Sequence, residues 1–348
     1  MTSSTAFLRS VEFGPPADYR IRPVYRFSDE ERRQLEGILD FDCNPYLDYP
    51  GFLERVLRIA EHHVPLYLRY LADDLRARNI WDEPVLLLNN CPMDDPVPEL
   101  GFEDPLNEKY RVKHRFVSEA FLQLFATLMG TTVVGYRTAN NGDMFHDIHP
   151  IRDLAHTPSQ KTVDTIKFHA DIPNNRVRPD WVYLLSMRND PVNDVYTVFV
   201  RLQDVFARLG AEVIEQLKRP VFYSPKDTVH VYGGAPDEAT PLKPLLTTER
   251  GHTFLAYFEG NTRSSEPDGA EAITKLDGIL HELGEPLFLY ERDLVAVSNN
   301  TAMHARWVKE IRNEEAHRAR WLLKTWNADN VEDHRDHLMP GRIATADE

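Results

Sequence analysis

Residues 167–197 read KFHADIPNNRVRPDWVYLLSMRNDPVNDVYT, a His-x-Asp triplet followed by a β-rich run. His169 and Asp171 are two residues apart, and the run WVYLLSM begins ten residues after Asp171. Alternate residues of an extended chain point to the same face, so an imidazole and a carboxylate at this spacing can reach one metal ion. One further imidazole would complete a 2-His-1-carboxylate triad, the ligand set that leaves positions open on a non-haem Fe(II).

A His-x-acid triplet is a weak signal by itself, because the chain contains 14 histidines and 55 acidic residues. A second triplet begins at His334, in the charged run NVEDHRDHLMPG. That run has no apolar periodicity, which favours a solvated tail over a ligand. His169 precedes a predicted strand in the middle of the chain, so context favours His169 as the metal ligand.

The overall composition is that of a folded globular protein. The chain has 348 residues, of which 42% are hydrophobic and 27% charged. The formal net charge of -15 disfavours nucleic-acid and anionic-membrane partners. The chain has two cysteines, Cys43 and Cys91, which argues against a disulfide scaffold or a cysteine-based metal site. The N-terminus lacks the apolar core of a signal peptide, and no run approaches the ~18 apolar residues of a membrane span. We therefore expect a cytoplasmic protein.

The first 130 residues are predicted to be mainly helical. Ser28 and Glu31 are spaced as a capping box, which predicts a helix through about residue 40. Apolar residues at helical spacing predict a second helical region over residues 52–78, which Pro65 should kink or split. A buried strand is expected over residues 84–90 and a helix over residues 115–129, ended by Gly130.

Strand-like runs dominate from residue 131 onward, and helices are expected over residues 202–217 and 270–283. We see no internal repeat or linker and predict one domain. In it, residues 1–130 form a helical wrapping region, residues 131–326 form the β core with the metal site, and residues 327–348 form a charged tail. The predicted class is mainly β with helices (α+β), built on a double sheet.

The second half of the predicted site lies near the C-terminus. His304 follows the strand-like run DLVAVSNN, and Arg320 lies 16 residues later, in ARWLLKTW. Arg318, Arg320, Leu322 and Lys324 should share one strand face. A planar guanidinium there suits bidentate capture of a carboxylate, although an internal salt bridge would explain one buried arginine equally well. The presence of His169, Asp171 and His304 in the same chain favours carboxylate capture.

Five motifs occur in a fixed order along the chain: FHAD, RPDWVYLLSMRN, YTVF, NNTAMH and RWLLK. In this order they resemble the signature of the Fe(II)/2-oxoglutarate-dependent oxygenases, in the clavaminate synthase-like and taurine dioxygenase-like group. Within that group the resemblance is to the hydroxylases of free arginine, asparagine and lysine, over about residues 135–326. It implies a double-stranded β-helix (jelly-roll) core wrapped by N-terminal and inserted helices. It also implies Fe(II), 2-oxoglutarate and O₂ as cofactor and co-substrates, and hydroxylation of an aliphatic C–H bond of a free L-amino acid or related small polar metabolite, in secondary metabolism.

The resemblance also implies roles for particular residues. His169, Asp171 and His304 would be the iron ligands, and Arg320 and Thr197 would bind 2-oxoglutarate. Lys324 stands where the amino acid hydroxylases usually have an arginine that grips the substrate carboxylate. Arg318 is the alternative for either arginine role. An aspartate at position 171 also argues against the related halogenases, which need a small residue there.

Asn141, Asn175, Arg178 and Arg263 are candidates for further polar contacts with the substrate, although residues of these types are more often plain turn or surface residues. The same iron site could instead catalyse desaturation or cyclisation, or act on a carrier-bound or nucleoside-linked substrate. A non-catalytic jelly-roll binding protein is the alternative from another class. The oligomeric state stays open, because the N-terminal helices could cover the core or form the face of a homodimer.

Overall fold

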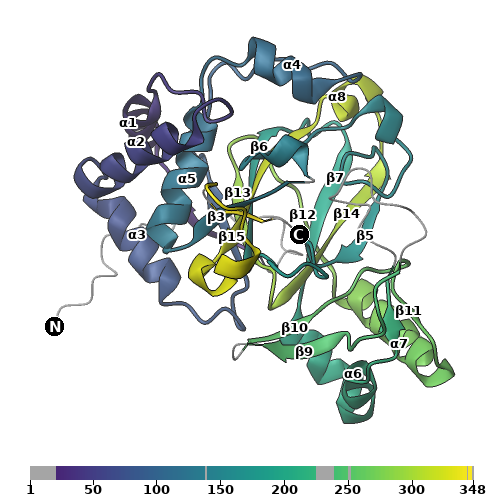
Figure 1. Cartoon of the computed structure of the whole chain (residues 1–348). Coiled ribbons are helices and arrows are strands. Elements are labelled where there is room, and N and C mark those ends of the chain that lie inside the picture. The colour runs from purple at the N-terminus through teal and green to yellow at the C-terminus, as the bar shows by residue number, and fades with distance from the viewer. Residues whose placement is uncertain (1–20, 138, 225–238, 250–251, 343, 347–348) are drawn as a thin grey trace.

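Two β-sheets that face each other form the centre of the molecule (Figure 1). The computed structural model describes residues 21–137, 139–224, 239–249, 252–342 and 344–346. The larger sheet has the strand order β1-β2-β13-β6-β15-β3-β16, with β4 also paired to β15, and the smaller sheet has the order β12-β7-β14-β5.

The strands of the larger sheet are β1 (Pro23–Arg26), β2 (Val85–Asn89), β3 (Thr132–Tyr136), β4 (His146–Ile148), β6 (Trp181–Arg188), β13 (Leu294–Ser298), β15 (Trp321–Ala328) and β16 (Thr345–Ala346). The smaller sheet contains β5 (Ile166–His169), β7 (Asp194–Arg201), β12 (Glu285–Leu287) and β14 (Ala302–Glu310). Two short ladders lie beside it: β8 (Phe222–Tyr223) pairs with β11 (Arg263–Ser264), and β9 (Leu246–Glu249) pairs with β10 (His252–Leu255).

Side chains of the central strand β6 alternate between two hydrophobic cores. Tyr183 and Leu185 belong to the core shared with the N-terminal helices, whereas Val182 and Leu184 belong to the core between the two sheets. Both faces of the strand are therefore covered, which explains why WVYLLSM is almost continuously apolar. The two-sheet core with helices that the sequence predicts is confirmed.

Helices α1 (Asp29–Leu39), α2 (Tyr49–His62), α3 (Leu66–Arg76) and α5 (Val117–Met129) cover the outer face of the larger sheet, and α4 (Pro105–Val112) lies near one end of it (Figure 1). The predicted capping box is present, because Glu31 N donates to Ser28 Oγ at 3.2 Å and Ser28 N donates to Glu31 Oε2 at 2.7 Å. Pro65 precedes α3 and separates it from α2, as predicted. Gly130 ends α5 in the left-handed conformation, with φ 73°.

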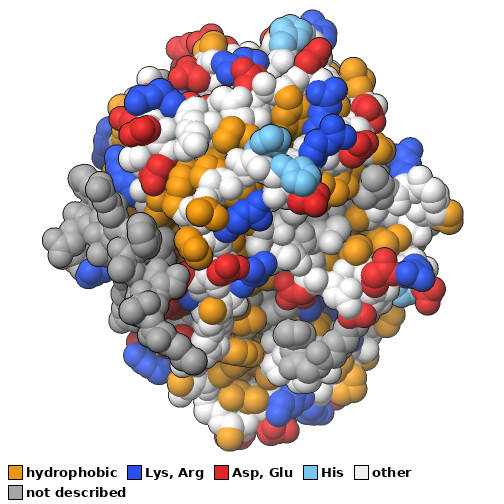
Figure 2. Space-filling model, turned by 90° about the vertical axis from the view of Figure 1, so that its left-hand side faces the viewer, with side chains coloured by type: hydrophobic (Ala, Val, Ile, Leu, Met, Phe, Trp, Pro, Cys, Tyr) orange, Lys and Arg blue, Asp and Glu red, His pale blue; other side chains and the backbone are white. Residues whose placement is uncertain are grey.

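The outer surface of this helical layer is of mixed character. Figure 2 shows acidic, basic and apolar side chains together on that side of the molecule. The exposed apolar side chains of α2 and α3 include Leu57, Leu66 and Tyr70. Leu66 and Tyr70 are four positions apart on α3 and so are neighbours, and a few exposed apolar residues of this kind are ordinary on a solvated helical layer.

Helices α6 (Leu202–Leu217) and α7 (Pro267–Leu283) cover the outer face of the smaller sheet, at the lower right of Figure 1. Their buried apolar residues pack with Val198 and Val200 of β7 and Met303 of β14. Across the described ranges, no helix combines the length and apolar character needed to cross a bilayer.

Two predictions for the C-terminal region are wrong. The expected strand over residues 318–326 begins only at Trp321, because Asn313 caps the short helix α8 (Glu314–Arg318) directly before it. The segment after residue 326 is not simply a solvated tail. β15 continues to Ala328, the 3₁₀ helix η4 (Val331–His337) buries His334, and β16 pairs with β3. The apolar residues of this segment are too few to give a periodic signal.

Candidate metal and co-substrate site

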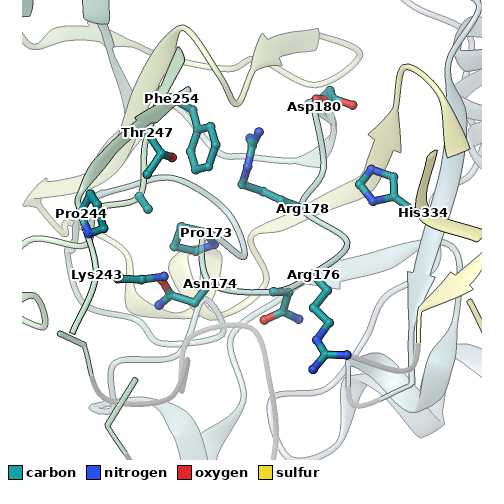
Figure 3. Close-up of a pocket in the computed structure, with 12 residues that line it drawn as sticks. Pro173, Asn174, Arg176, Arg178, Asp180, Lys243, Pro244, Thr247, Phe254 and His334 are labelled. Atoms are coloured by element: carbon teal, nitrogen blue, oxygen red, sulfur yellow. The ribbon is translucent and has the colours of Figure 1, made fainter. Parts of the chain in front are cut away.

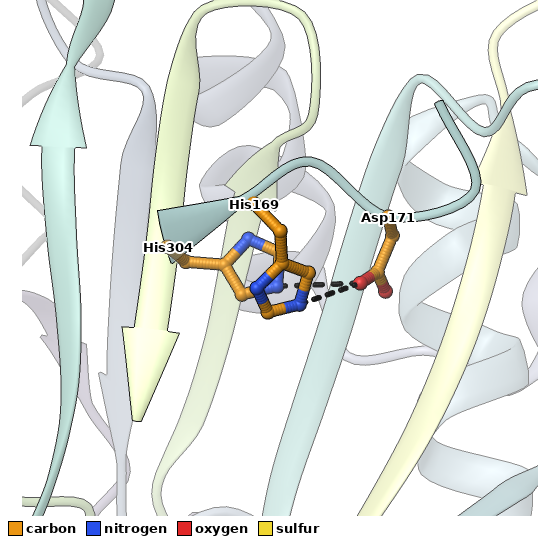
Figure 4. A group of neighbouring side chains, drawn as sticks. All are labelled: His169, Asp171 and His304. Carbon is orange, nitrogen blue, oxygen red and sulfur yellow. Dashed lines mark ion pairs between the residues drawn. The ribbon is translucent and has the colours of Figure 1, made fainter. Parts of the chain in front are cut away.

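His169, Asp171 and His304 come together between the two sheets (Figure 4). His169 ends β5, and His304 lies in β14 directly opposite it in the antiparallel ladder. Asp171 follows two residues after β5 ends. Its Oδ1 atom lies 3.4 Å from His169 Nε2 and 3.3 Å from His304 Nε2.

The geometry of these three groups fits a divalent metal ion. Ligand atoms about 2.1 Å from a metal and at right angles to each other are about 3.0 Å apart, close to the two separations above. His169 Nδ1 contacts the carbonyl oxygen of Lys167 at 2.8 Å, an outer contact that fixes the ring with Nε2 toward Asp171. Burial, with a smaller contribution from His169, lowers the pKa of His304 to about 4, so its imidazole is neutral near pH 7, as metal ligation requires.

Hydrogen bonds on several sides orient the Asp171 carboxylate. Its Oδ2 atom accepts from Trp326 Nε1 at 2.6 Å and from Lys324 Nζ at 3.0 Å. The Asn299 side chain forms two hydrogen bonds to the backbone of Asp171. Its Oδ1 accepts from Asp171 N at 2.8 Å, and its Nδ2 donates to Asp171 O at 2.9 Å. With Oδ2 and the backbone held in this way, Oδ1 faces the two imidazoles.

Arg320 and Thr197 line the same cavity as the three potential ligands. The cavity walls also include apolar residues of both sheets: Ile148, Ile166, Leu184, Ala305 and Leu322. Arg320 is 3% exposed, and its Nε and Nη1 atoms have no hydrogen-bond partner among the described residues. Burial lowers the pKa of Arg320 to about 10, so the guanidinium stays charged near pH 7. A carboxylate bound in the cavity would satisfy both donors and compensate the buried charge.

Arg306 is a cavity residue that the sequence interpretation missed. It lies two residues after His304 on β14, and its guanidinium donates to the carbonyl oxygens of Gln160 at 3.3 Å, Thr162 at 2.6 Å and Asp164 at 2.8 Å. It therefore ties the loop of residues 160–164 to the metal-site strand. Burial, and then the nearby Arg320, lowers the pKa of Arg306 to about 9. The i, i+2 spacing from His304 is a signal that could have revealed this residue, had His304 been assigned to a strand instead of being placed after one.

Lys324 and Arg318 differ in position, although the sequence placed them on one strand face. Lys324 lines the cavity, where its ammonium donates to Gln160 Oε1 at 2.6 Å and to Asp171 Oδ2 at 3.0 Å. Arg318 ends α8 at the surface and pairs with Glu314 at 2.7 Å. The prediction that Arg318 shares the strand face is wrong, because the backbone is helical there, and Arg318 does not line the cavity.

A second hollow of about 300 Å³ lies beside the segment that follows Asp171 (Figure 3). Asn175 and Arg178 line it, and the Arg178 guanidinium carbon lies 3.7 Å from the centre of the Phe254 ring. His334, expected in a solvated tail, is 7% exposed and also lines this hollow. That expectation is wrong because η4 folds back onto the core.

The other two predicted substrate residues, Arg263 and Asn141, are not among the described side chains that line either cavity. Arg263 is exposed in β11, opposite Tyr223, and lines neither the metal-site cavity nor the second hollow. Asn141 belongs to the 3₁₀ turn η2 (Asn140–Gly142), but its side chain lies outside the described part of the chain.

Comparison with known proteins gives matches in both sequence and fold. The chain is 25% identical over 270 residues to clavaminate synthase 2 of Streptomyces clavuligerus, covering 75% of this chain and 79% of that protein. It is 24% identical over 236 residues to L-asparagine oxygenase of Streptomyces coelicolor, covering 66% and 68% respectively. No family model matches the chain.

Two solved structures have a similar fold. Asparagine oxygenase in complex with Fe(II), 2S,3S-3-hydroxyasparagine and succinate aligns with a TM-score of 0.77 at 18% identity, covering 93% of this chain and 98% of that one. The non-haem iron oxygenase OrfP in complex with Fe, succinate and (3S)-hydroxy-L-Arg aligns with a TM-score of 0.73 at 20% identity, covering 94% and 99%. The fold similarity therefore extends over nearly the whole chain. In sequence the chain is therefore a homologue of clavaminate synthase and asparagine oxygenase, and its fold is that of the two solved non-haem iron oxygenases.

Proposed function

We propose that this chain is a non-haem Fe(II)/2-oxoglutarate-dependent dioxygenase that hydroxylates an aliphatic C–H bond of a free L-amino acid or a related small polar metabolite. The observation that carries the proposal is the convergence of His169, Asp171, His304 and Arg320 on one buried cavity. The relatives support it, because asparagine oxygenase and OrfP have been solved with iron, succinate and a hydroxylated amino acid.

In this proposal each cavity residue has a defined task. His169, Asp171 and His304 hold Fe(II) through two nitrogens and one oxygen, which leaves the remaining positions open. The bound iron, together with 2-oxoglutarate and O₂, supplies the oxidising power for C–H hydroxylation. Arg320 binds the distal carboxylate of 2-oxoglutarate through Nε and Nη1, and Thr197 on the facing sheet lines the same compartment. The apolar walls keep water from the reacting groups.

The substrate side of the site is proposed to include the second hollow. Pro173, Asn174 and Asn175 line this hollow, and Pro173 is only two residues after Asp171 in the chain, so the segment that carries the iron ligand continues into the wall of the hollow. Asn175 and Arg178 offer amide and guanidinium groups suited to a small polar molecule. Arg263 and Arg318 are not assigned a role, because both lie at the surface.

We also propose that the protein acts in the cytoplasm and that it has no nucleic-acid partner. The formal net charge of -15 supports the second point, because a phosphate backbone requires a basic surface. Light scattering would separate a monomer from a homodimer formed through the N-terminal helices.

The proposal is tested by incubating the purified protein with Fe(II), 2-oxoglutarate and O₂ and screening the common L-amino acids. Succinate released in proportion to one added amino acid, with a product heavier by one oxygen atom, is the expected result. A product lighter by two hydrogen atoms would indicate desaturation or cyclisation instead. A protein that binds 2-oxoglutarate but yields no succinate with free amino acids, related small polar metabolites, or carrier-bound or nucleoside-linked substrates would favour the binding-protein alternative.

A further inference from the structure

We infer that Lys324 is a positioning residue for the metal centre, which holds the Asp171 carboxylate, and not the group that binds a substrate carboxylate. The inference rests on the proposed function only in taking His169, Asp171 and His304 as metal ligands. It departs from the role that the sequence resemblance implies for position 324.

The contacts of Lys324 carry the inference. Its Nζ atom lies 3.0 Å from Asp171 Oδ2, and the two side chains are 2% and 1% exposed. Trp326 Nε1 donates to the same oxygen at 2.6 Å. Lys324 and Trp326 are alternate residues of β15, so one strand face presents two donors to one carboxylate oxygen. Oδ1 then remains the oxygen that faces His169 and His304.

The ammonium is also held from its other side. Lys324 Nζ donates to Gln160 Oε1 at 2.6 Å, and Gln160 is 4% exposed. The carbonyl oxygen of Gln160 accepts from Arg306 Nη1 at 3.3 Å, so the loop that presents this amide is itself fixed to β14. Lys324 is therefore fixed between a structural amide and the carboxylate.

This arrangement favours metal positioning over substrate capture for an energetic reason. If the Lys324 ammonium moved to a substrate carboxylate, its hydrogen bonds to Asp171 Oδ2 and Gln160 Oε1 would be lost. The buried Asp171 carboxylate would then lose its cationic partner, which is energetically costly. Hydrogen bonds to a ligating carboxylate set its orientation and the strength with which it binds the metal. An arginine at this position would present a planar fork, whereas a lysine places a compact charge against a single oxygen. A carboxylate on the substrate would then be bound by other groups of the site.

The test is anaerobic titration of the protein with Co(II), followed by the visible absorption of the bound ion, for the intact protein and the Lys324→Met variant. Loss of the ammonium should weaken Co(II) binding by about 10- to 100-fold, the usual effect of removing a partner of a metal ligand. Gln160→Leu, which leaves the charge in place but removes its tether, should weaken Co(II) binding by a smaller factor. Lys309→Met, at an exposed position of β14, should bind Co(II) as the intact protein does.

The outcomes separate this inference from the proposed function. If the intact protein bound no Co(II), or bound it equally after His169→Ala, the metal site itself would be wrong. If the intact protein bound Co(II) through His169 and both Lys324→Met and Gln160→Leu bound it unchanged, only the inference about Lys324 would be overturned. If Lys324→Met failed to fold, Gln160→Leu would decide, since unchanged Co(II) binding in that variant overturns the inference.

Discussion

His169 and His304 lie directly opposite each other across the antiparallel pair of β5 and β14, with ring centroids 4.3 Å apart. This register brings together two imidazoles from distant parts of the chain. Because β5 ends at His169, the backbone is free to turn and direct Asp171 toward both rings. The site is therefore a product of strand pairing: His169 lies on the edge strand β5, His304 on the neighbouring strand β14, and Asp171 just beyond the end of β5.

Replacing Arg320 with methionine should raise the Kd for 2-oxoglutarate by about 10- to 100-fold, because a charge-assisted hydrogen bond contributes about 1.5–3 kcal/mol. Metal binding should stay unchanged, since Nε and Nη1 of Arg320 form no hydrogen bond to His169, Asp171 or His304. The measurement is titration of the anaerobic Co(II) protein with 2-oxoglutarate.

Arg318→Met is the matched control, since Arg318 lies two residues earlier but pairs with Glu314 at the surface. Unchanged 2-oxoglutarate binding is expected for Arg318→Met. Weaker binding in this variant with unchanged binding in Arg320→Met would reverse the assignment of the two arginines.

Asn175→Ala and Arg178→Ala should raise the KM for the substrate about 10-fold, because each removes a polar group from the second hollow. The KM for 2-oxoglutarate should change little. Steady-state kinetics with each compound varied in turn provides the test. Arg178 also donates a hydrogen bond to Asn300, so Arg178→Ala could raise the KM through a structural change. Asn175→Ala, which leaves that bond intact, separates this effect from the loss of a substrate contact.

Arg263→Ala is the control for these two variants, because Arg263 is exposed and lines neither cavity. If Arg263→Ala raised the substrate KM while Asn175→Ala and Arg178→Ala did not, the second hollow would not be part of the substrate site.

Phe145→Ala should lower the free energy of unfolding by about 3–5 kcal/mol, the usual cost of removing a fully buried aromatic side chain. The Phe145 ring is fully buried and makes edge contacts with the rings of Tyr46, Tyr49 and Phe52 from the N-terminal region. Denaturant unfolding should show one transition with a lower midpoint, as one domain requires.

Leu66→Ala, at an exposed position of α3, should change the free energy of unfolding by less than about 0.5 kcal/mol. A separate early transition for residues 21–130, with the metal site still formed, would contradict the single-domain prediction.

Arg306→Met should increase hydrogen exchange of the amides in residues 160–164 and weaken metal binding indirectly. The variant removes the donors for three carbonyl oxygens of that loop, and each buried carbonyl left unsatisfied costs about 1–3 kcal/mol. Exchange followed by mass spectrometry would test this. Unchanged protection of the loop would show that other contacts hold it.

The sequence predicted those parts of the fold whose signal is local. The capping box at Ser28, the break at Pro65 and the apolar run of β6 depend on neighbours in the chain, and all three are present as expected. The strand β5 is four residues long, too short for a periodic signal, so the prediction placed His169 before a strand instead of at the end of one.

Other features of the site depend on contacts between distant segments. Lys324 and Trp326 donate hydrogen bonds to Asp171, and Arg306 donates hydrogen bonds to residues 160–164. Each of these bonds joins residues more than 100 positions apart, so no local sequence pattern predicts them. The helix α8, which removes Arg318 from the strand, lies in the charged run NEEAHR, where no apolar periodicity marks it.

The most direct test of the metal and co-substrate site is anaerobic addition of Fe(II) and 2-oxoglutarate to the metal-free protein, followed by the weak visible charge-transfer band of the iron chelate. The account predicts a band in the intact protein that is lost in His169→Ala and weakened in Arg320→Ala at the same 2-oxoglutarate concentration. A folded, intact protein without this band, or a band that persists unchanged in His169→Ala, would contradict it.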